Sequence, residues 1–246
     1  MQVISSLSPN FDERAPGKAI DMLVLHYTGM TTMAAALSRM LDMNAKVSAH
    51  YMIDEDGTLY RLVDEERRAW HAGVSYWAGE RDINSVSVGI ELVNPGHAYP
   101  GYAGGYRAFP EAQMATLIDL ARGIMRRHDI LPERVLGHSD VAPARKTDPG
   151  ELFDWDRLAE EGLAVMPANA QVEEGVDLER GASGAGVSLL QQRLGRLGYE
   201  IEATGAFDEQ TELVVIAFQR HFRRGQVDGV ADSETRGCLN ALLGFF

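Results

Sequence analysis

The sequence predicts an α/β protein with a mixed central β-sheet flanked by helices, followed by a small all-α domain of three helices. Over about the first 165 residues, short β-prone apolar runs alternate with segments of helical periodicity, as in α/β domains. An Asp56-Gly57 pair joins two neighbouring strand-like runs, and a hairpin there makes the sheet mixed. The end of the chain carries only helical patterns, after a stretch rich in small residues, Pro and Gly.

The expected strands are short apolar runs bounded by turn residues. They are AIDMLVLHYTG (residues 19–29), the hairpin SAHYMIDEDGTLYRLVDEE (48–66), SVSVGIELVN (85–94) and RVLGHSD (134–140). Pro95 and Gly96 end the third run, and a Gly- and Tyr-rich loop is expected over residues 96–110.

The helices of this part are predicted from apolar spacing and capping residues. TTMAAALSRMLDM (31–43) contains helix-forming residues, with Thr31 or Thr32 as the N-cap. PEAQMATLIDLARGIMRRHDI (110–130) has the pattern of a long amphipathic helix, and FDWDRLAEEGLA (153–164) that of a short one. The first domain therefore alternates strands and helices along its length.

We expect a first domain over residues 1–165, a linker over 166–180 and a helical domain over 181–246. The helical domain contains a weak internal repeat. TGAFDEQT (204–211) and DGVADSET (228–235) each place a Gly turn, an acidic residue and a Thr before a helix. Aliphatic and aromatic residues then recur at helical spacing, as three packed helices require.

The composition is that of an ordinary globular protein, with 246 residues, 45% hydrophobic and 24% charged. The formal charge of −13 argues against nucleic acid or an anionic membrane as the main partner. No apolar run approaches the roughly 18 residues of a transmembrane helix. The single cysteine, Cys238, excludes an internal disulfide and a cysteine-based zinc finger. The N-terminal residues lack the features of a signal peptide, which predicts a cytoplasmic protein. A leader removed before this sequence begins would instead indicate the periplasm or the outer membrane.

Two histidines and one aspartate are expected at one edge of the sheet. His26 ends the first strand and His138 the last, and side chains at strand ends of an open α/β sheet enter a crevice. Asp148 follows on a loop, where Pro149 restricts it to an extended backbone. Two imidazoles and a carboxylate suit a catalytic zinc, which takes three protein ligands and keeps one position open to water. Spacing alone also fits hydrogen-bonded strand-end histidines and an Asp-Pro-Gly turn.

Glu91 and Lys146 extend this set. Glu91 has Ile90, Leu92 and Val93 as apolar neighbours, so its carboxylate must point into a cavity, find a partner or be protonated. Beside a metal, such a carboxylate could act as a general base, and Lys146 could stabilise an oxyanion. The structural alternatives are a carboxylate that caps an exposed sheet face and a solvated loop lysine.

Five sequence blocks cover about residues 20–160. They are LVLHYTG, SAHYMIDEDGTLYRLV, AWHAG, VGIELVN and GHSDVAPARKTDPG. In this order they resemble the zinc-dependent N-acetylmuramoyl-L-alanine amidases of the AmpD/AmiD type, a family related to the peptidoglycan recognition proteins. In the tail, LLQQRLGRLGY, GAFDEQT, VVIAFQRHF and DGVADSET resemble, less specifically, the peptidoglycan-binding module found beside many cell-wall enzymes.

The resemblance implies that His26, His138 and Asp148 bind one Zn²⁺ ion per chain. It also implies that Glu91 is the catalytic carboxylate and Lys146 the second catalytic residue. None of these five positions departs from the family pattern. The bond cut would join the lactyl carbonyl of N-acetylmuramic acid to L-alanine of the stem peptide, and the expected partners are peptidoglycan or anhydromuropeptide fragments.

Further positions near these blocks are expected to contact substrate. They are Tyr27, His50, Trp70, His71 and Asn94. Alternatively, His50 and His71 could lie behind the metal ligands and support them, and Trp70 could belong to the core.

Two alternatives and one choice of substrate remain at this point. A peptidoglycan-binding or sensing protein without turnover would tend to lack the third ligand, whereas Asp148 is present. A zinc peptidase with a peptidoglycan-binding tail would need Asp between two His, an order that this chain does not offer convincingly. The tail favours polymeric peptidoglycan, and the missing leader favours soluble fragments inside the cell. The sequence gives no indication of the oligomeric state.

Overall fold

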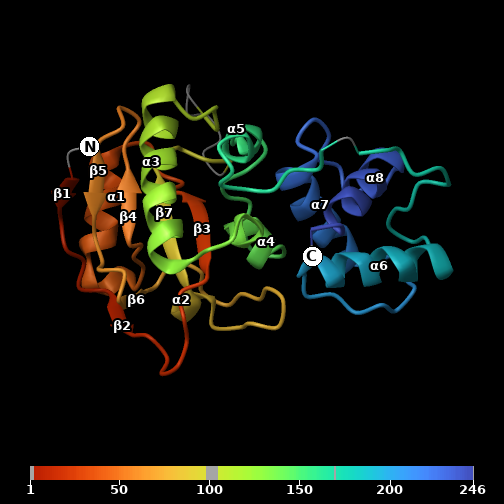
Figure 1. Cartoon of the computed structure of the whole chain (residues 1–246), viewed down its shortest axis with the longest axis horizontal. Helices are drawn as coiled ribbons and strands as arrows, with labels where there is room; N and C mark the ends of the chain where they lie inside the picture. The colour runs from red at the N-terminus through yellow and green to blue at the C-terminus, as the bar shows by residue number, and fades with distance from the viewer. Residues whose placement is uncertain (1–2, 98–104, 169, 246) are drawn as a thin grey trace.

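The computed structural model describes residues 3–97, 105–168 and 170–245, and comprises a sheet-containing part followed by a bundle of helices (Figure 1). Part of the loop predicted after residue 95 and one residue of the expected linker fall outside these ranges. Within them, no helix is both long and apolar enough to cross a membrane.

The central sheet has six strands within the described residues, in the order β1-β5-β4-β7-β3-β8. The strands are β1 (Val3–Ser5), β3 (Met22–Tyr27), β4 (Tyr51–Ile53), β5 (Leu59–Arg61), β7 (Ser87–Leu92) and β8 (Val135–Gly137). β4, β7, β3 and β8 run parallel, whereas β5 is antiparallel to β4 and β1 runs parallel to β5. The β4–β5 hairpin therefore makes the sheet mixed, which confirms the predicted fold class. A separate antiparallel pair is formed by β2 (Phe11–Glu13) and β6 (Arg67–Ala69).

Helices and short helical turns flank the sheet. They are α1 (Met33–Leu41), η1 (Met43–Ala45), α2 (Ile83–Val86), α3 (Glu111–His128), η2 (Pro132–Arg134), α4 (His138–Val141) and α5 (Trp155–Glu160). Side chains of α3 that enter the core include Met114, Leu117, Ala121 and Ile124. Leu25 of β3 and Ile90 of β7 belong to the same cluster, so this face of the sheet packs against α3 (Figure 1). Burying one such aliphatic side chain contributes about 1.5–3 kcal/mol. Because side chains alternate along a strand, the next residues, His26 and Glu91, point to the opposite face.

Some local predictions are confirmed and others need correction. Thr32 is the N-cap of α1, and its hydroxyl accepts a hydrogen bond from Ala35 N at 3.2 Å. The strands β1, β2 and β6 were not predicted. Each has three residues, and every residue of β1 and β2 is exposed, which leaves no alternating pattern. His138 begins α4 directly after β8 instead of ending a strand. It therefore lies on a single helical turn.

The helical domain contains α6 (Ala185–Leu197), α7 (Glu209–Phe222) and α8 (Ser233–Leu242). Its sequence repeat corresponds to two equivalent N-caps. Asp208 accepts a hydrogen bond from Thr211 N at 2.9 Å, and Asp232 accepts one from Thr235 N at 2.8 Å.

Two buried glutamines connect each helix to the repeat unit that follows it. The side-chain amides of Gln191 and Gln219 donate to the hydroxyl of the following unit's Thr, and their carbonyls accept from the backbone N–H of its Gly turn. The buried amides are thus satisfied, as a small helical core requires.

The two parts share one hydrophobic core. Met22 and Trp77 of the first part belong to the same cluster of buried residues as Leu194 and Phe218 of the helical domain. The Trp77 ring meets Tyr199 edge to face, with centroids 4.9 Å apart. Ala78 N donates to Gly198 O at 2.8 Å beside this contact. The helical domain is therefore docked against the sheet-containing part.

Candidate metal centre

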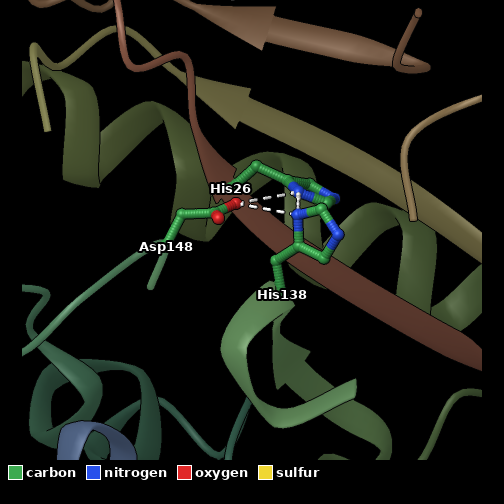
Figure 2. Close-up of side chains that lie close together, drawn as sticks. All are labelled: His26, His138 and Asp148. Carbon is green, nitrogen blue, oxygen red and sulfur yellow. Dashed lines mark hydrogen bonds and ion pairs between the residues drawn. The ribbon is translucent and has the colours of Figure 1, made fainter. Parts of the chain in front are cut away.

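His26, His138 and Asp148 come from separate segments and meet at one point (Figure 2). His26 is the next-to-last residue of β3, His138 is the first residue of α4, and Asp148 lies in the loop that follows α4. The Oδ2 atom of Asp148 lies 3.1 Å from Nδ1 of His26 and 3.0 Å from Nδ1 of His138. The two Nδ1 atoms are 2.9 Å apart. All three side chains are buried.

This geometry fits a divalent cation. Ligand atoms bound at about 2.0–2.1 Å to a tetrahedral metal lie about 3.3 Å apart, close to the separations found here. Two imidazole nitrogens and a carboxylate oxygen that converge in a buried space repel one another unless a cation or protons lie between them. Whether the nitrogens offer lone pairs depends on the tautomer of each imidazole.

The surroundings of His138 fix its tautomer. Its Nε2 lies 3.0 Å from the carbonyl oxygen of Ala72. A carbonyl only accepts hydrogen bonds, so Nε2 carries the proton and Nδ1 presents a lone pair toward Asp148. A hydrogen bond of this kind is the usual support of a metal-binding histidine.

A longer chain of hydrogen bonds fixes the tautomer of His26. The Ser87 hydroxyl donates to Ile83 O at 2.6 Å, so it accepts from Nε2 of His71 at 3.1 Å. The Nδ1 of His71 is then unprotonated and accepts from Nε2 of His26 at 3.1 Å. His26 therefore also turns an Nδ1 lone pair toward the site.

The ionisation of these groups agrees with this picture. Burial, followed by the neighbouring His138, lowers the pKa of His26 to about 4, so this ring is neutral at pH 7. Burial, followed by the charge of His26, lowers the pKa of His71 well below its usual value. For Asp148, burial alone would raise the pKa, but the charges and hydrogen bonds of the two histidines outweigh it and lower the pKa. The candidate donor set is thus the Nδ1 atoms of two imidazoles and one carboxylate oxygen, a set that metals such as zinc prefer.

Glu91 lies beside the three ligand residues. It pairs with His26 in the β3–β7 ladder, and both side chains point to the same face. Its carboxyl group is buried, and among the described residues Oε2 has no hydrogen-bond partner. Burial raises the pKa of Glu91 well above its usual value, the charge of Asp148 adds to this, and Lys146 opposes it. The sequence predicts that this carboxylate points into a cavity, finds a partner or is protonated. In the structure Glu91 faces the site, and its pKa is raised.

Lys146 lies on the loop between α4 and Asp148. Its positive charge lowers the pKa of Glu91 and of His26, in both cases as the smallest of the contributions. No hydrogen bond or ion pair of the ammonium group is found within the described ranges, and the residue is half-buried. Its charge is therefore available to a group bound at the site.

The predicted substrate contacts differ from one another in the structure. Tyr27 is half-buried at the site, and its hydroxyl lies 2.7 Å from Thr147 Oγ1 and 3.0 Å from His97 Nδ1. His71 is buried behind His26, the second of the two places left open for it.

Direct contact with substrate is wrong for two further residues and unsupported for a third. His50 is fully buried, and its ring nitrogens lie within hydrogen-bond distance of Gly89 N and Arg67 O. Asn94 is fully buried in the turn after β7, with both ends of its amide bonded to backbone. The indole of Trp70 donates to Asp12 on the separate β2–β6 pair at 2.7 Å.

Gly89 makes room for His71. A Cβ atom at this position would lie 2.4 Å from Cγ of the His71 ring, closer than any real contact. Gly89 lies between Ser87 and Glu91 on the face that carries the site. Ser87, Thr147 and this role of Gly89 were not predicted from the sequence. For Ser87 and Gly89, the sequence signal is the two-residue spacing that places them on one face with Glu91.

The fold and the site define a class of protein. A mixed α/β sheet carries a buried two-histidine, one-aspartate metal-binding arrangement at a strand end, with a buried carboxyl group of raised pKa beside it. This combination is typical of a metal-assisted hydrolase.

Comparisons with known proteins identify the family. Residues 16–151 match the family described as N-acetylmuramoyl-L-alanine amidase, and residues 183–239 match a peptidoglycan binding domain family. The chain belongs to the N-acetylmuramoyl-L-alanine amidase family and is an amidase of the AmpD/AmiD type, which confirms the function inferred from the sequence blocks.

Relatives and solved structures cover both domains. The chain is 36% identical to the amidase AmiD of Escherichia coli over 231 residues, 91% of this chain and 82% of AmiD. It is 32% identical to the 1,6-anhydro-N-acetylmuramyl-L-alanine amidase AmpD of Haemophilus influenzae over 168 residues, 61% of this chain and 86% of AmpD. The structure of AmiD from E. coli, in complex with anhydro-N-acetylmuramic acid-L-Ala-D-gamma-Glu-L-Lys, superposes with a TM-score of 0.79 at 32% identity. It covers 96% of this chain and 98% of AmiD. AmpDh3 of Pseudomonas aeruginosa superposes with a TM-score of 0.75 at 29% identity, over 98% of both chains.

Proposed function

We propose that this amidase works with one Zn²⁺ ion held by His26, His138 and Asp148, with Glu91 as the general base and Lys146 as the oxyanion-stabilising cation. The observation that carries the proposal is the convergence of three ligand atoms within about 3 Å of one another beside a buried carboxyl group that has no partner for Oε2 among the described residues. Zinc accepts two imidazoles and one carboxylate, and keeps a fourth position open in catalytic sites.

Zinc held there supplies Lewis-acid polarisation of the scissile carbonyl and a lowered pKa for water. Glu91 is placed on the neighbouring strand to accept the proton that the attacking water loses. Burial raises the pKa of Glu91, which makes its carboxylate a stronger base than that of an exposed glutamate. A stronger base suits a group that accepts a proton and then passes it on. The same carboxyl group delivers this proton to the leaving amine of L-alanine.

Lys146 acts on the oxygen of the lactyl carbonyl. When water attacks this carbonyl, negative charge develops on its oxygen, and a nearby ammonium group stabilises that charge more in the transition state than in the ground state. The ammonium group is free of partners within the described ranges, so binding this oxygen breaks no existing ion pair.

We infer that soluble anhydromuropeptides are substrates. Two solved structures that match nearly the whole chain contain such molecules: AmiD with an anhydromuramoyl tripeptide and AmpDh3 with an anhydromuramic pentapeptide. The match of residues 183–239 to a peptidoglycan binding domain family supports binding of polymeric peptidoglycan as well.

The test is to incubate the zinc-loaded protein with a purified anhydromuropeptide and with intact sacculi, and to identify the products by mass spectrometry. Release of free stem peptides that stops with a chelator and returns with zinc supports the proposal. Glu91→Gln should lower kcat by about 10²–10⁴ and retain zinc. The matched control is Glu66→Gln, at an exposed carboxylate, which should leave kcat unchanged.

Three results would contradict parts of the proposal. Cleavage within the stem peptide would contradict the assigned bond. Full kcat in Glu91→Gln would remove this carboxyl group from the mechanism. A chain that is active without zinc, or whose His138→Ala variant binds zinc as tightly as before, would contradict the ligand assignment.

A further inference from the structure

Asp140 is a buried carboxylate two residues after the proposed ligand His138. Its side chain is completely inaccessible to solvent. Oδ2 accepts hydrogen bonds from Gly137 N and from His221 Nδ1, both at 2.7 Å, and Oδ1 accepts one from the hydroxyl of Tyr199 at 2.8 Å. A buried carboxylate is costly unless it is satisfied in this way.

Two of the three donors come from the helical domain. Tyr199 lies two residues after the end of α6, and His221 lies near the end of α7. A carboxylate only accepts hydrogen bonds, so His221 carries its proton on Nδ1. Its ring is stacked on Trp155, with centroids 3.7 Å apart, and Tyr199 is held edge to face by Trp77. Ring packing therefore holds both donors in place, independently of their hydrogen bonds to Asp140.

The turn that carries Asp140 also carries one of the proposed ligands, His138. α4 is one turn long, from His138 to Val141, and the Gly137 N–H bond of Asp140 closes its start. Ser139 N donates to Asp148 O at 2.9 Å, so the same turn anchors the backbone of the third proposed ligand. A single turn has too few internal hydrogen bonds to be rigid by itself. Its position therefore depends on what holds it from outside.

We propose that the helical domain positions the metal site: Tyr199 and His221 hold Asp140, and through it the α4 turn that sets His138 and Asp148 in place. This inference rests on the proposed role of these two residues as metal ligands. Tyr199 and His221 are positioning residues, because neither touches the ligand atoms. The domain that matches a peptidoglycan-binding family thus supports the proposed metal site from outside.

An exposed contact between the domains provides the contrast. Arg81 and Glu200 form an ion pair across the interface, with side chains 69% and 48% exposed. Such pairs contribute little. The helical domain could instead act only by being docked. In that case, removing the Tyr199 or His221 hydrogen bond should weaken metal binding no more than any other substitution that lowers the stability of the helical domain by the same amount.

The experiment measures the zinc dissociation constant of the full chain by competition with a chromophoric chelator, together with the Tm of each metal-free variant. The test variants are Tyr199→Phe, His221→Leu and His221→Asn, the last of which keeps a side-chain N–H near the Nδ1 position. The controls are Glu200→Gln, which breaks the exposed pair, and Leu239→Ala, which opens a cavity in the α8 side of the helical core without touching Asp140.

Loss of a hydrogen bond behind a ligand weakens metal binding by about 10–100-fold. We expect this loss in Tyr199→Phe and His221→Leu, partial rescue in His221→Asn, and dissociation constants within twofold of the unsubstituted chain in both controls. The proposal is overturned if the two test variants bind zinc as the unsubstituted chain does. It is also overturned if Leu239→Ala loses as much affinity as they do at an equal drop in Tm. Unchanged zinc affinity in His138→Ala would overturn both this inference and the ligand assignment. Retained affinity in Tyr199→Phe and His221→Leu alone would leave the proposed function intact.

Discussion

Substituting Ser87 with Ala tests the hydrogen-bond chain behind His26. The Ser87 hydroxyl is the only acceptor found for Nε2 of His71 among the described residues, and it also donates to Ile83 O. Ser87→Ala leaves a buried imidazole N–H and a buried carbonyl without this partner. At about 1–3 kcal/mol for each unsatisfied group, we expect the free energy of unfolding to fall by about 2–6 kcal/mol.

The more specific effect is on metal binding. Without the hydroxyl, His71 is no longer held with its proton on Nε2 and can turn an Nδ1–H toward His26 instead. His26 would then have to keep its own proton on Nδ1, the atom that we propose binds the metal. We expect zinc affinity to fall by about 10–100-fold, which corresponds to about 1.4–2.7 kcal/mol.

Two assays check this prediction. Chelator competition gives the zinc affinity, and long-range ¹H–¹⁵N correlation spectra of the histidines report which ring nitrogen is protonated. The matched control is Ser85→Ala, another buried serine, whose hydroxyl accepts from Ala15 N and does not contact His71. The reasoning is refuted if Ser87→Ala loses stability and still binds zinc within twofold of the unsubstituted chain. It is equally refuted if Nε2 of His26 is unprotonated in the zinc-loaded protein.

Three further predictions concern other parts of the structure. Gly89→Ala should lower both Tm and zinc affinity, because its Cβ would lie 2.4 Å from the His71 ring; calorimetry and chelator competition measure these, and unchanged values would contradict the close contact. Burial alone would raise the pKa of Glu65, but hydrogen bonds from Arg127 and two other partners outweigh it and lower the pKa from 4.5 to about 2. The carboxylate therefore stabilises the fold fully above about pH 4.5, and up to about 3 kcal/mol is lost as the pH falls through about 2. Denaturant titrations of the unsubstituted chain and of Glu65→Gln should converge over this range, and a constant difference would contradict the assignment. Gln219→Leu should destabilise the helical domain by about 1–3 kcal/mol, since it removes the acceptor of the buried Gly229 N–H. Urea unfolding followed by circular dichroism tests this, and a loss below about 0.5 kcal/mol would show that water replaces the amide.

Much of the proposed site could be predicted from the sequence, because strand ends and turn residues are local signals. His26 closes an apolar run, and the Asp-Pro-Gly turn marks Asp148. The pairing of His26 with Glu91 could not be predicted, since the register between β3 and β7 depends on contacts between segments 65 residues apart. His138 was predicted in the right place but in the wrong element, because one helical turn is too short to produce a periodic pattern.

The misassigned substrate contacts have a physical explanation. His50 and Asn94 lie within the sequence blocks that carry the site, but a sequence does not show which way a polar side chain points. Both ring nitrogens of His50 lie within hydrogen-bond distance of backbone groups in two other segments, and the Asn94 side chain closes a turn. A polar residue near a site can serve equally as a contact or as a support, and only its hydrogen-bond partners distinguish the two roles.

The two histidines of the proposed site are supported from different sides. The ring of His26 is oriented from within the sheet, by a chain of hydrogen bonds that ends on the backbone of α2. The ring of His138 is oriented by Ala72 O, and the segment that follows Ala72 contacts the helical domain through Trp77. The first support lies inside the amidase domain, whereas the second extends into the helical domain. The two supports meet at His71 and Ala72, whose backbone N–H groups both donate to Asn84 Oδ1, at 3.1 and 2.8 Å. A disturbed interface between the domains would then weaken metal binding by the three proposed ligands even when the sheet itself is intact.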